Sequence, residues 1–310
     1  MVLDIFVPFY GDPEVLLLAV ESVRRQDSGD WRLTVVDDCY PDTTVGERVA
    51  ALGDDRVRYV RNETNLGITG NFARCAELAT ADRVVIMGYD DVLLPNYVST
   101  IAAAHEAYPQ ADIIQPGVRV IDETGADSST LADWVKQHVV RPRGDGRMLL
   151  SGERLAASLL HGDWLYWPSL AFRRETLQAV PFRAGLAVIQ DLALEIDIVL
   201  AGGTLLYEPT VCFAYRRHTS SASSAKLLGA AKFTGEREYF TLAAALFRRR
   251  GWRRAERAAR LHLTSRAHAL TLLPSALVAR ETATTKALLS HAFRPLQRRV
   301  APTNPSEVAS

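Results

Sequence analysis

Two adjacent carboxylates, Asp90 and Asp91, are the residues of this sequence best placed to do chemistry. They follow the apolar residues 84–87, whose β-branched side chains predict a buried strand, and Pro95 beyond them suits the first turn of a helix. In an open α/β sheet the carboxyl ends of the strands form the ligand crevice. Adjacent acids repel one another there unless a cation lies beside them. A divalent metal that carries a diphosphate is a natural candidate, because hard cations bind carboxylate and phosphate oxygens; a solvated turn is the alternative.

The elements that position this pair are predicted by an alternation of strand-like and helix-like segments over residues 1–121. Strands are expected at residues 2–7, 33–36, 57–60, 84–87 and 113–120, and helices after Asp12 and at residues 43–52, 68–79 and 96–107. Such β-α alternation predicts a parallel sheet covered by helices on both faces.

Polar residues follow four consecutive predicted strands. They are Tyr10 and Asp12, then Asp37 and Asp38, then residues 61–65, and finally Asp90 and Asp91. Together they indicate a binding site, although for any one of them a capping or turn role is an equal alternative. The first strand is not followed by G-x-G-x-x-G, so a hydride-transfer enzyme with a dinucleotide cofactor is disfavoured.

The middle of the chain is less regular. Residues 122–150 are predicted to be an irregular connection, and a second body begins at Ser151. We expect a strand-like segment at 169–173, a helix ending near 179, an apolar helix at 189–200, and two strands at 205–207 and 211–215. Three aromatic residues, Trp164, Tyr166 and Trp167, could stack on a sugar ring or pack in the core.

The last part of the chain differs in charge. Residues 225–310 hold 16 Lys and Arg against 5 Asp and Glu, although the whole chain has a formal net charge of +0. This part is predicted to be helical, with a disordered end from Pro302. Seven arginines (248, 249, 250, 253, 254, 257 and 260) together with Phe247 and Trp252 predict attachment to an anionic membrane surface; a solvated basic helix is the alternative. No nucleic-acid-reading motif accompanies these arginines, so a nucleic-acid partner is not expected.

Composition sets the broad class and compartment. The 310 residues are 48% hydrophobic and 23% charged, as in ordinary globular proteins. The three cysteines lack metal-like or disulfide-like spacing, and we expect neither a signal peptide nor a transmembrane helix. A cytoplasmic protein, peripheral at the inner face of the membrane, is therefore predicted.

The order of several motifs resembles family 2 glycosyltransferases of the GT-A fold. The motifs lie at residues 7–10, 35–38, 65–71 and 88–95, followed by 169–173, 190–191 and 215–218, so the resemblance covers about residues 1–224. It implies an α/β fold with a Rossmann-like, mostly parallel sheet and helices on both faces, here with a helical C-terminal extension. The parts would be a nucleotide-sugar-binding half (1–121), an acceptor-binding and catalytic half (122–224) and the basic extension (225–310).

The resemblance also implies roles for individual residues. Asp191 would be the general base, Asp91 the metal ligand, and Asp90 a ligand of the metal or the ribose; His218 would contact metal or diphosphate. Asp38 would meet the base or ribose of the nucleotide. The donor site as a whole would comprise Pro8, Tyr10, Asp38, Asn65, Gly67, Asn71 and Asp90.

Three positions depart from the family pattern. Gly88 stands where the first acid of Asp-x-Asp-Asp is usual, which leaves open which carboxylate is the main metal ligand. Gln190 replaces the usual Glu before Asp191. Asn71 is followed by Phe-Ala, so no arginine is carried over there.

The predicted function is inverting, metal-dependent transfer of a sugar, with Mn²⁺ or Mg²⁺, from a nucleotide-diphosphate sugar to an acceptor hydroxyl. UDP is the default nucleotide, and the acceptor would be a sugar, a lipid-linked glycan or a small molecule. A carboxylate must take the proton because the hydroxyl pKa is very high; Glu195, one turn after Asp191, is the rival base. The alternatives are a nucleotidyltransferase, disfavoured because residues 8–12 contain no Lys or Arg, and a non-catalytic nucleotide-sugar-binding protein.

Overall fold

The computed structural model describes residues 1–296 apart from 145, 184, 187–188 and 218–224. The chain forms two compact units, the first from residues 1–152 and 164–218 and the second from residues 153–163 and 219–310. Residues 153–163 thus belong with the C-terminal helices, although they are distant from them in sequence.

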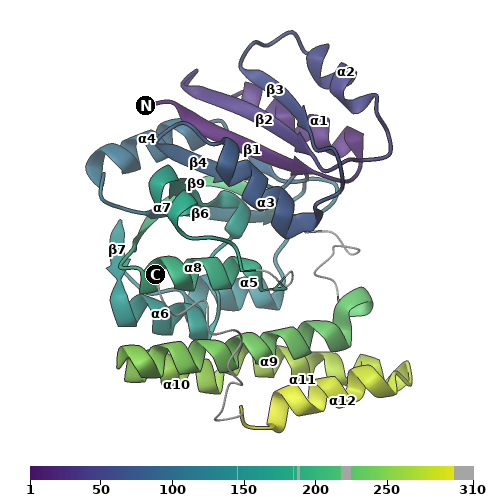
Figure 1. Cartoon of the computed structure of the whole chain (residues 1–310), viewed down its shortest axis with the longest axis vertical. Helices are drawn as coiled ribbons and strands as arrows, with labels where there is room; N and C mark the ends of the chain where they lie inside the picture. Colours follow the sequence, from purple (N-terminus) through teal and green to yellow (C-terminus); the bar gives the residue numbers. More distant parts are fainter. Residues whose placement is uncertain (145, 184, 187–188, 218–224, 297–310) are drawn as a thin grey trace. The chain divides into compact units, whose positions relative to one another are not determined.

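A single mixed sheet organises the first unit, with its strands in the order β3-β2-β1-β4-β8-β6-β9-β5 and β7 paired to β9. Figure 1 shows β3, β2, β1 and β4 side by side, and these four strands are parallel. The strands are β1 (Leu3–Phe9), β2 (Trp31–Asp37), β3 (Val57–Arg61), β4 (Arg83–Ile86), β5 (Val92–Leu93), β6 (Ile113–Ile121), β7 (Met148–Ser151), β8 (Ala171–Arg173) and β9 (Thr204–Arg216).

The sheet confirms the predicted α/β class and adds antiparallel strands to it. β8 inserts between β4 and β6 and runs antiparallel to both, whereas β6 and β9 are parallel to one another. The two strands expected at 205–207 and 211–215 are one continuous strand, β9, which passes through an irregularity opposite Gly117.

The helices of the first unit cover both faces of the sheet. They are α1 (Pro13–Arg24), α2 (Val45–Ala50), α3 (Gly67–Leu78), α4 (Tyr97–Ala107), α5 (Leu131–Val135), a π-helical turn (Lys136–Val140), a 3-10 turn (Trp167–Ser169), α7 (Arg174–Ala179) and α8 (Gln190–Leu200). α1 begins as predicted, because Asp12 Oδ1 accepts a hydrogen bond from the Glu14 N–H at 2.9 Å.

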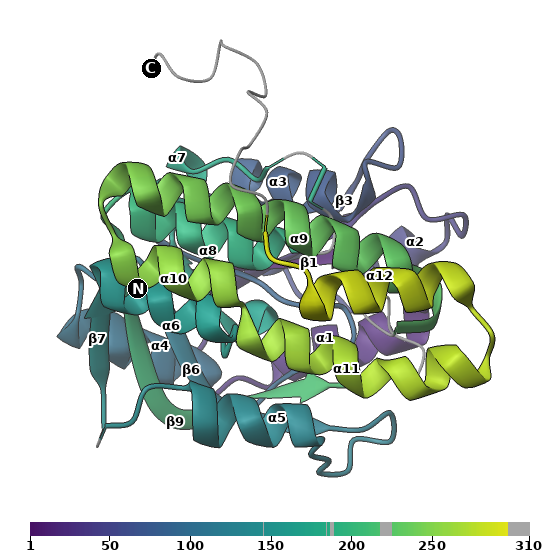
Figure 2. The same ribbon diagram turned by 90° about the horizontal axis from the view of Figure 1, so that it is seen from below.

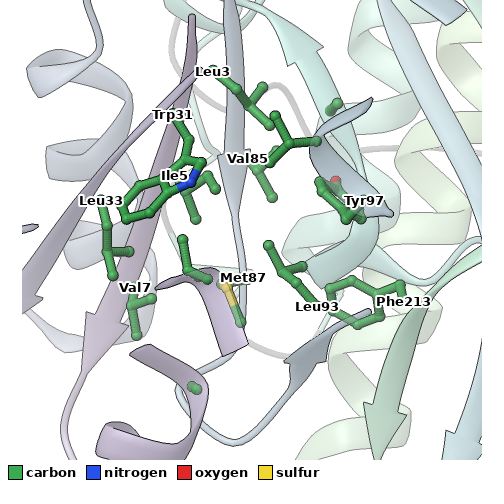
Figure 3. Packing of buried hydrophobic residues seen from close by; sticks show 14 of the residues in the cluster. Leu3, Ile5, Val7, Trp31, Leu33, Val85, Met87, Leu93, Tyr97 and Phe213 are labelled. Carbon is green, nitrogen blue, oxygen red and sulfur yellow. The ribbon is translucent and has the colours of Figure 1, made fainter. Parts of the chain in front are cut away.

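Side chains alternate between the two faces of each strand, and this alternation builds two packed layers. Leu3, Ile5, Val7 and Phe9 of β1 all point into one cluster, which includes residues of α1, α2 and α4. Figure 3 shows this packing around the centre of the sheet. On the other face, Phe72 of α3 stacks on Trp167, with ring centroids 6.0 Å apart.

Two local predictions were wrong. Residues 122–150 are not wholly irregular, because they contain α5, the π-helical turn and β7. Pro95 does not open a helix: residues 92–93 form β5, which pairs with β9, and α4 begins at Tyr97. The helix predicted at residues 96–107 does form, one residue shorter, as α4, so only the place of Pro95 in its first turn was wrong.

The second unit is helical, as predicted for the C-terminal part. It consists of α6 (Gly152–His161), α9 (Ala225–Arg250), α10 (Arg253–Leu261), α11 (Leu263–Val278) and α12 (Thr282–Phe293), and Figure 2 shows α11 and α12 side by side. Buried Phe233, Ala269 and Leu288 bring α9, α11 and α12 together. In the described part of the chain, no helix is both long and apolar enough to cross a membrane.

Phe247 cannot serve as the predicted membrane anchor. Its side chain has 0% exposure and stacks on Trp252, with centroids 5.7 Å apart and planes at 13°. Apolar residues of this unit that do face outward include Leu263, Leu270 and Leu277 of α11, which are 54%, 42% and 57% exposed, and Leu289 and Phe293 of α12, which are 41% and 66% exposed.

Candidate active site

The first four strands end at one edge of the sheet. Phe9 of β1 lies opposite Asp37 of β2, which lies opposite Arg61 of β3. The Met87 N–H, directly after β4, donates to the Phe6 carbonyl at 2.9 Å. The polar residues that follow these strands are therefore brought to the same edge of the sheet.

Asp38 is held in a buried polar network at this edge. Its Oδ1 accepts from Asn62 Nδ2 at 2.9 Å and from the Leu66 N–H at 2.8 Å. Asn62 Nδ2 also donates to Asn71 Oδ1 at 3.0 Å, and Asn71 Nδ2 donates to the Val36 carbonyl at 2.9 Å. Asn71 therefore positions Asp38, and Asn62, which sequence reasoning did not single out, links the two.

The loop between β3 and α3 is shaped by Asn65 and Gly67. Asn65 Oδ1 accepts from the Gly67 N–H at 2.9 Å, and Gly67 has φ 71°, a conformation that favours glycine. Both predicted site residues thus set the course of the chain beside Asp38.

An aromatic group flanks the end of β1. Tyr10 is 51% exposed, and its ring meets Tyr40 edge to face at 5.4 Å. Pro8 precedes it within β1 and is half-buried. Tyr40 also packs against Phe9 at 5.1 Å, so the exposed ring of Tyr10 has a fixed neighbour.

Asp37 has a structural role that differs from that of Asp38. It has 0% exposure and forms an ion pair with Arg61 at 2.7 Å, while the same guanidinium donates to the Tyr40 carbonyl at 2.7 Å. Tyr59 also donates to Asp37, and burial followed by this bond raises the pKa of Tyr59 to about 12. Asp37 and Arg61 therefore fix Tyr40.

Asp91 is a buried carboxylate with 1% exposure. Its Oδ1 accepts from the Arg216 backbone N–H at 2.8 Å, and Arg216 Nε donates to the Asp90 carbonyl at 2.7 Å. Burial, and then the neighbouring charge of Asp90, raise the pKa of Asp91 well above its ordinary value. Arg216 was not a predicted site residue; the only sequence signal was its place in the Tyr215-Arg-Arg-His run.

Gly88, which stands where the family usually has an acid, leaves room for the side chains of Asp90 and Asp91. A Cβ added at Gly88 would lie 2.6 Å from Asp91 Oδ2 and 2.8 Å from Asp90 Oδ1. The two carboxylates thus turn back over the glycine, and their oxygens converge where a side chain would otherwise stand.

Asp191 lies in the first turn of α8 and is half-buried. Ile189 occupies the N-cap position, so Asp191 is not the helix cap, although its Oδ1 accepts from the Leu192 N–H at 3.0 Å. Glu195, the rival base, has 0% exposure. Partial exposure therefore favours Asp191 as the carboxylate that a substrate can reach.

The neighbour of Asp191 connects it to the donor side. Buried Gln190 accepts a hydrogen bond from the Thr69 hydroxyl of α3. Thr69 stands two residues from Asn71, which belongs to the Asp38 network. α3 thus joins the predicted base and the predicted nucleotide contact.

The other predicted site residues are His218 and the three aromatic residues of the 164–167 segment. His218 lies outside the described residues. Within the described residues, no group of three or more His, Cys, Asp or Glu side chains is arranged to hold a metal. Trp167 belongs to the core, between Phe72 and Phe172, whereas Trp164 and Tyr166 line a cavity.

Comparison with known proteins decides the family. The family described as "Glycosyl transferase family 2" matches residues 4–175, more than half of the chain. The chain belongs to this family. Members of this family often use a divalent metal, and the match favours sugar transfer over nucleotidyl transfer.

Individual relatives of this family 2 glycosyltransferase are more distant. The uncharacterized protein y4gI of Sinorhizobium fredii is 33% identical over 137 residues, which are 43% of this chain and 15% of that protein. The succinoglycan biosynthesis protein ExoO of Rhizobium meliloti is 25% identical over 220 residues, 70% of this chain and 61% of ExoO. The chain therefore spans less than two thirds of either relative.

Solved structures share the fold. The S. aureus TarS 1-349 structure in complex with UDP-GlcNAc superposes with a TM-score of 0.68 at 13% identity, covering 94% of this chain and 82% of that chain. This likeness confirms the predicted α/β GT-A fold with C-terminal helices.

Proposed function

We propose that this family 2 glycosyltransferase is an inverting, metal-dependent enzyme that moves a sugar from a UDP-sugar to an acceptor hydroxyl. The observation that carries the proposal is Asp91, a fully buried carboxylate with a raised pKa beside a second carboxylate. Two such acids are stabilised when a cation joins them, and a diphosphate completes the coordination of that cation. UDP is chosen because TarS, which shares the fold, was solved with UDP-GlcNAc.

A divalent cation, Mn²⁺ or Mg²⁺, fits the donor set. Mg²⁺ is usually held by one or two carboxylates together with substrate phosphates and water, so Asp90 and Asp91 suffice as protein ligands. When bound, the cation would stabilise negative charge on the leaving diphosphate. Arg216 orients both acids, through its N–H to Asp91 and its guanidinium to the Asp90 main chain. His218 is a further proposed contact of metal or diphosphate.

The donor nucleotide is proposed to lie over the ends of β1, β2 and β3. The Asp38 carboxylate, held by Asn62 and the Leu66 N–H, would accept a hydrogen bond from the base or the ribose. The exposed face of Tyr10 offers a stacking surface for the base. Pro8, Asn65, Gly67 and Asn71 shape this surface.

Asp191 is the proposed general base. As the acceptor oxygen forms its bond to the anomeric carbon, its proton passes to an Asp191 carboxylate oxygen. The bond between that carbon and the diphosphate oxygen breaks, and its electron pair leaves with the diphosphate. One displacement inverts the configuration, which requires one base on the acceptor side. Glu195 is too deeply buried to share this role.

The acceptor is proposed to be a glycan of the cell envelope, because ExoO is named for succinoglycan biosynthesis. A cytoplasmic enzyme at the inner face of the membrane would meet such an acceptor on its lipid carrier. The α11 stripe of Leu263, Leu270 and Leu277 offers apolar contacts, and six exposed arginines (248, 249, 250, 253, 254 and 257) offer charge.

Calorimetry of UDP with and without Mn²⁺ tests the proposal. Asp91→Asn should weaken Mn²⁺-dependent UDP binding about tenfold or more, because one charged ligand is lost. Asp127→Asn, at a side chain that is 78% exposed, is the matched control and should bind as wild type. Unchanged affinity and metal dependence in Asp91→Asn would remove this carboxylate from the site.

A further inference from the structure

A cavity of about 310 Å³ opens in the first unit beside β6 and β9, and none of the residues that line it belongs to the proposed donor site. Its volume lies at the lower end of the range for small-molecule sites, which suits a sugar unit. Six side chains give it its chemical character: Gln115, Gln137, Arg141, Trp164, Tyr166 and Tyr207.

The floor of the cavity is built by a break in strand pairing. β6 and β9 change register on both sides of Gly117, so β9 carries extra residues there. A Cβ at Gly117 would lie 2.6 Å from the Pro209 carbonyl oxygen, so only glycine fits. Bulges of this kind redirect side chains and are frequent next to binding sites.

The walls combine flat apolar rings with amide groups. Trp164 meets Tyr207 edge to face at 6.2 Å, and Gln137 Nε2 donates to the Tyr166 hydroxyl at 3.3 Å. Aromatic rings bind the apolar faces of sugars, and amides bind their hydroxyls. This combination indicates a carbohydrate ligand.

Arg141 supplies a positive charge that the protein does not balance there. Its guanidinium lies 4.6 Å from the centre of the Tyr207 ring and donates to the Tyr207 hydroxyl. Of the buried acids in neighbouring segments, Glu208 pairs with Arg147, and Asp133 pairs with Arg217 and also accepts from the Tyr166 hydroxyl at 3.2 Å. In the described part of the chain, none of the residues lining the cavity is acidic, and Arg141 forms no ion pair.

The cavity is linked to the reaction centre through an aromatic pair. The Tyr166 ring contacts Tyr215 at 5.4 Å, and Tyr215 precedes Arg216, whose N–H holds Asp91. Val211, at the cavity, lies five residues before Arg216 on β9, roughly 17 Å in an extended strand. The Tyr166 wall of the cavity therefore lies beside the residue that leads to Asp91, whereas the Val211 wall lies farther back along β9.

We propose that this cavity binds an acidic sugar unit of the acceptor glycan, at a distance from the hydroxyl that is glycosylated. The anionic group pairs with Arg141, and the ring lies among Trp164, Tyr166 and Tyr207. The shared chemistry is a sugar bearing a negative group, which a uronate carboxylate or a sugar phosphate can supply. The inference rests on the proposed transferase function and adds the class of its acceptor.

Calorimetry on the full chain without donor tests this inference, with methyl β-D-glucuronide, glucose 6-phosphate, methyl β-D-glucoside and inorganic phosphate as probes. At least one acidic sugar should bind about tenfold more tightly than the neutral glucoside, the order expected for one charge-assisted pair. Which acidic sugar binds identifies the group. Arg141→Gln should abolish the difference, whereas Arg143→Gln, the same change at an exposed position, should keep it.

Several results would overturn the inference. The role of Arg141 would be contradicted if acidic and neutral sugars bound equally, if no sugar bound, or if Arg143→Gln lost the difference as fully as Arg141→Gln. If inorganic phosphate bound as tightly as glucose 6-phosphate, the cavity would recognise the phosphate alone and not the sugar ring. UDP binding with Mn²⁺, measured on the same samples, reports on folding and separates the two proposals: if UDP binds and no sugar does, only the acceptor subsite fails.

Discussion

The Thr69 hydroxyl of α3 donates a hydrogen bond to the side-chain carbonyl of Gln190, the residue directly before the proposed base Asp191. The two residues are 121 positions apart in sequence. Gln190 is 5% exposed, so the bond lies in the interior and fixes the first turn of α8 against the helix that also carries Asn71.

Removing this hydroxyl is expected to impair turnover more than donor binding. Thr69→Val keeps the shape but leaves the buried Gln190 carbonyl without its donor, which costs about 1–3 kcal/mol of stability. Asp191 then loses its fixed position, so kcat should fall while the Kd for UDP stays near the wild-type value. Thr69→Ser retains the hydroxyl and should restore kcat. A Thr69→Val enzyme with normal kcat would show that the bond does not position the base.

Loss of the base itself is expected to be more severe. Asp191→Asn keeps size and shape but cannot accept a proton, so transfer should slow by about a hundred- to ten-thousand-fold with UDP affinity nearly intact. The measurement is single-turnover transfer beside UDP calorimetry. Glu195→Gln is the matched control; if it abolishes transfer while Asp191→Asn does not, the catalytic carboxylate is Glu195.

The helical unit should lose stability in mild acid. Burial lowers the pKa of His262 to about 4 and of His291 to about 3, and both side chains have 0% exposure. Between about pH 6.5 and pH 4 the unfolded chain binds protons that the folded unit does not. The free energy of unfolding therefore decreases as the pH is lowered through this range, by up to roughly 1.4 kcal/mol per pH unit for each histidine.

The charges packed around this histidine pair act in both directions. Arg237 of α9 and Arg266 of α11 disfavour protonation of both histidines. Burial raises the pKa of Glu236, so this group stabilises the folded unit at low pH and loses that contribution as the pH rises through its folded pKa.

The pH dependence of stability in the helical unit can be measured by hydrogen exchange of the backbone amides of α9, α11 and α12. Replacing exposed His161 with Gln should leave the slope unchanged, and pH-independent protection in the wild type would contradict the expectation.

Membrane attachment should depend on α11 as well as on the arginines. Leu270→Ser with Leu277→Ser should reduce pelleting with anionic vesicles at low salt, and high salt should release the wild type, because each basic residue near the surface contributes roughly 1 kcal/mol. Leu18→Ser, at a residue of α1 that is 60% exposed, should pellet normally. If the wild type did not pellet with anionic vesicles at low salt, the α11 leucines and the arginines would not form a membrane-binding surface.

The sequence alone determined what depends on neighbours along the chain. Apolar runs predicted β1 to β4, Asp12 and Pro13 predicted the start of α1, and the order of motifs predicted the family and the GT-A fold. These signals lie within a few residues of one another, where periodicity and capping act. For the same reason, the acids after β2 and β4 could be chosen as candidates before their surroundings were known.

Tertiary structure decided which side chains meet, because those contacts depend on strand register and helix packing between distant segments. Arg216 reaches Asp91 across 125 residues, and Thr69 reaches Gln190 across 121. Phe247 reads locally as an exposed anchor but is buried against Trp252. The cavity beside Gly117 exists because β9 shifts register against β6, and no local pattern in either strand encodes that pairing.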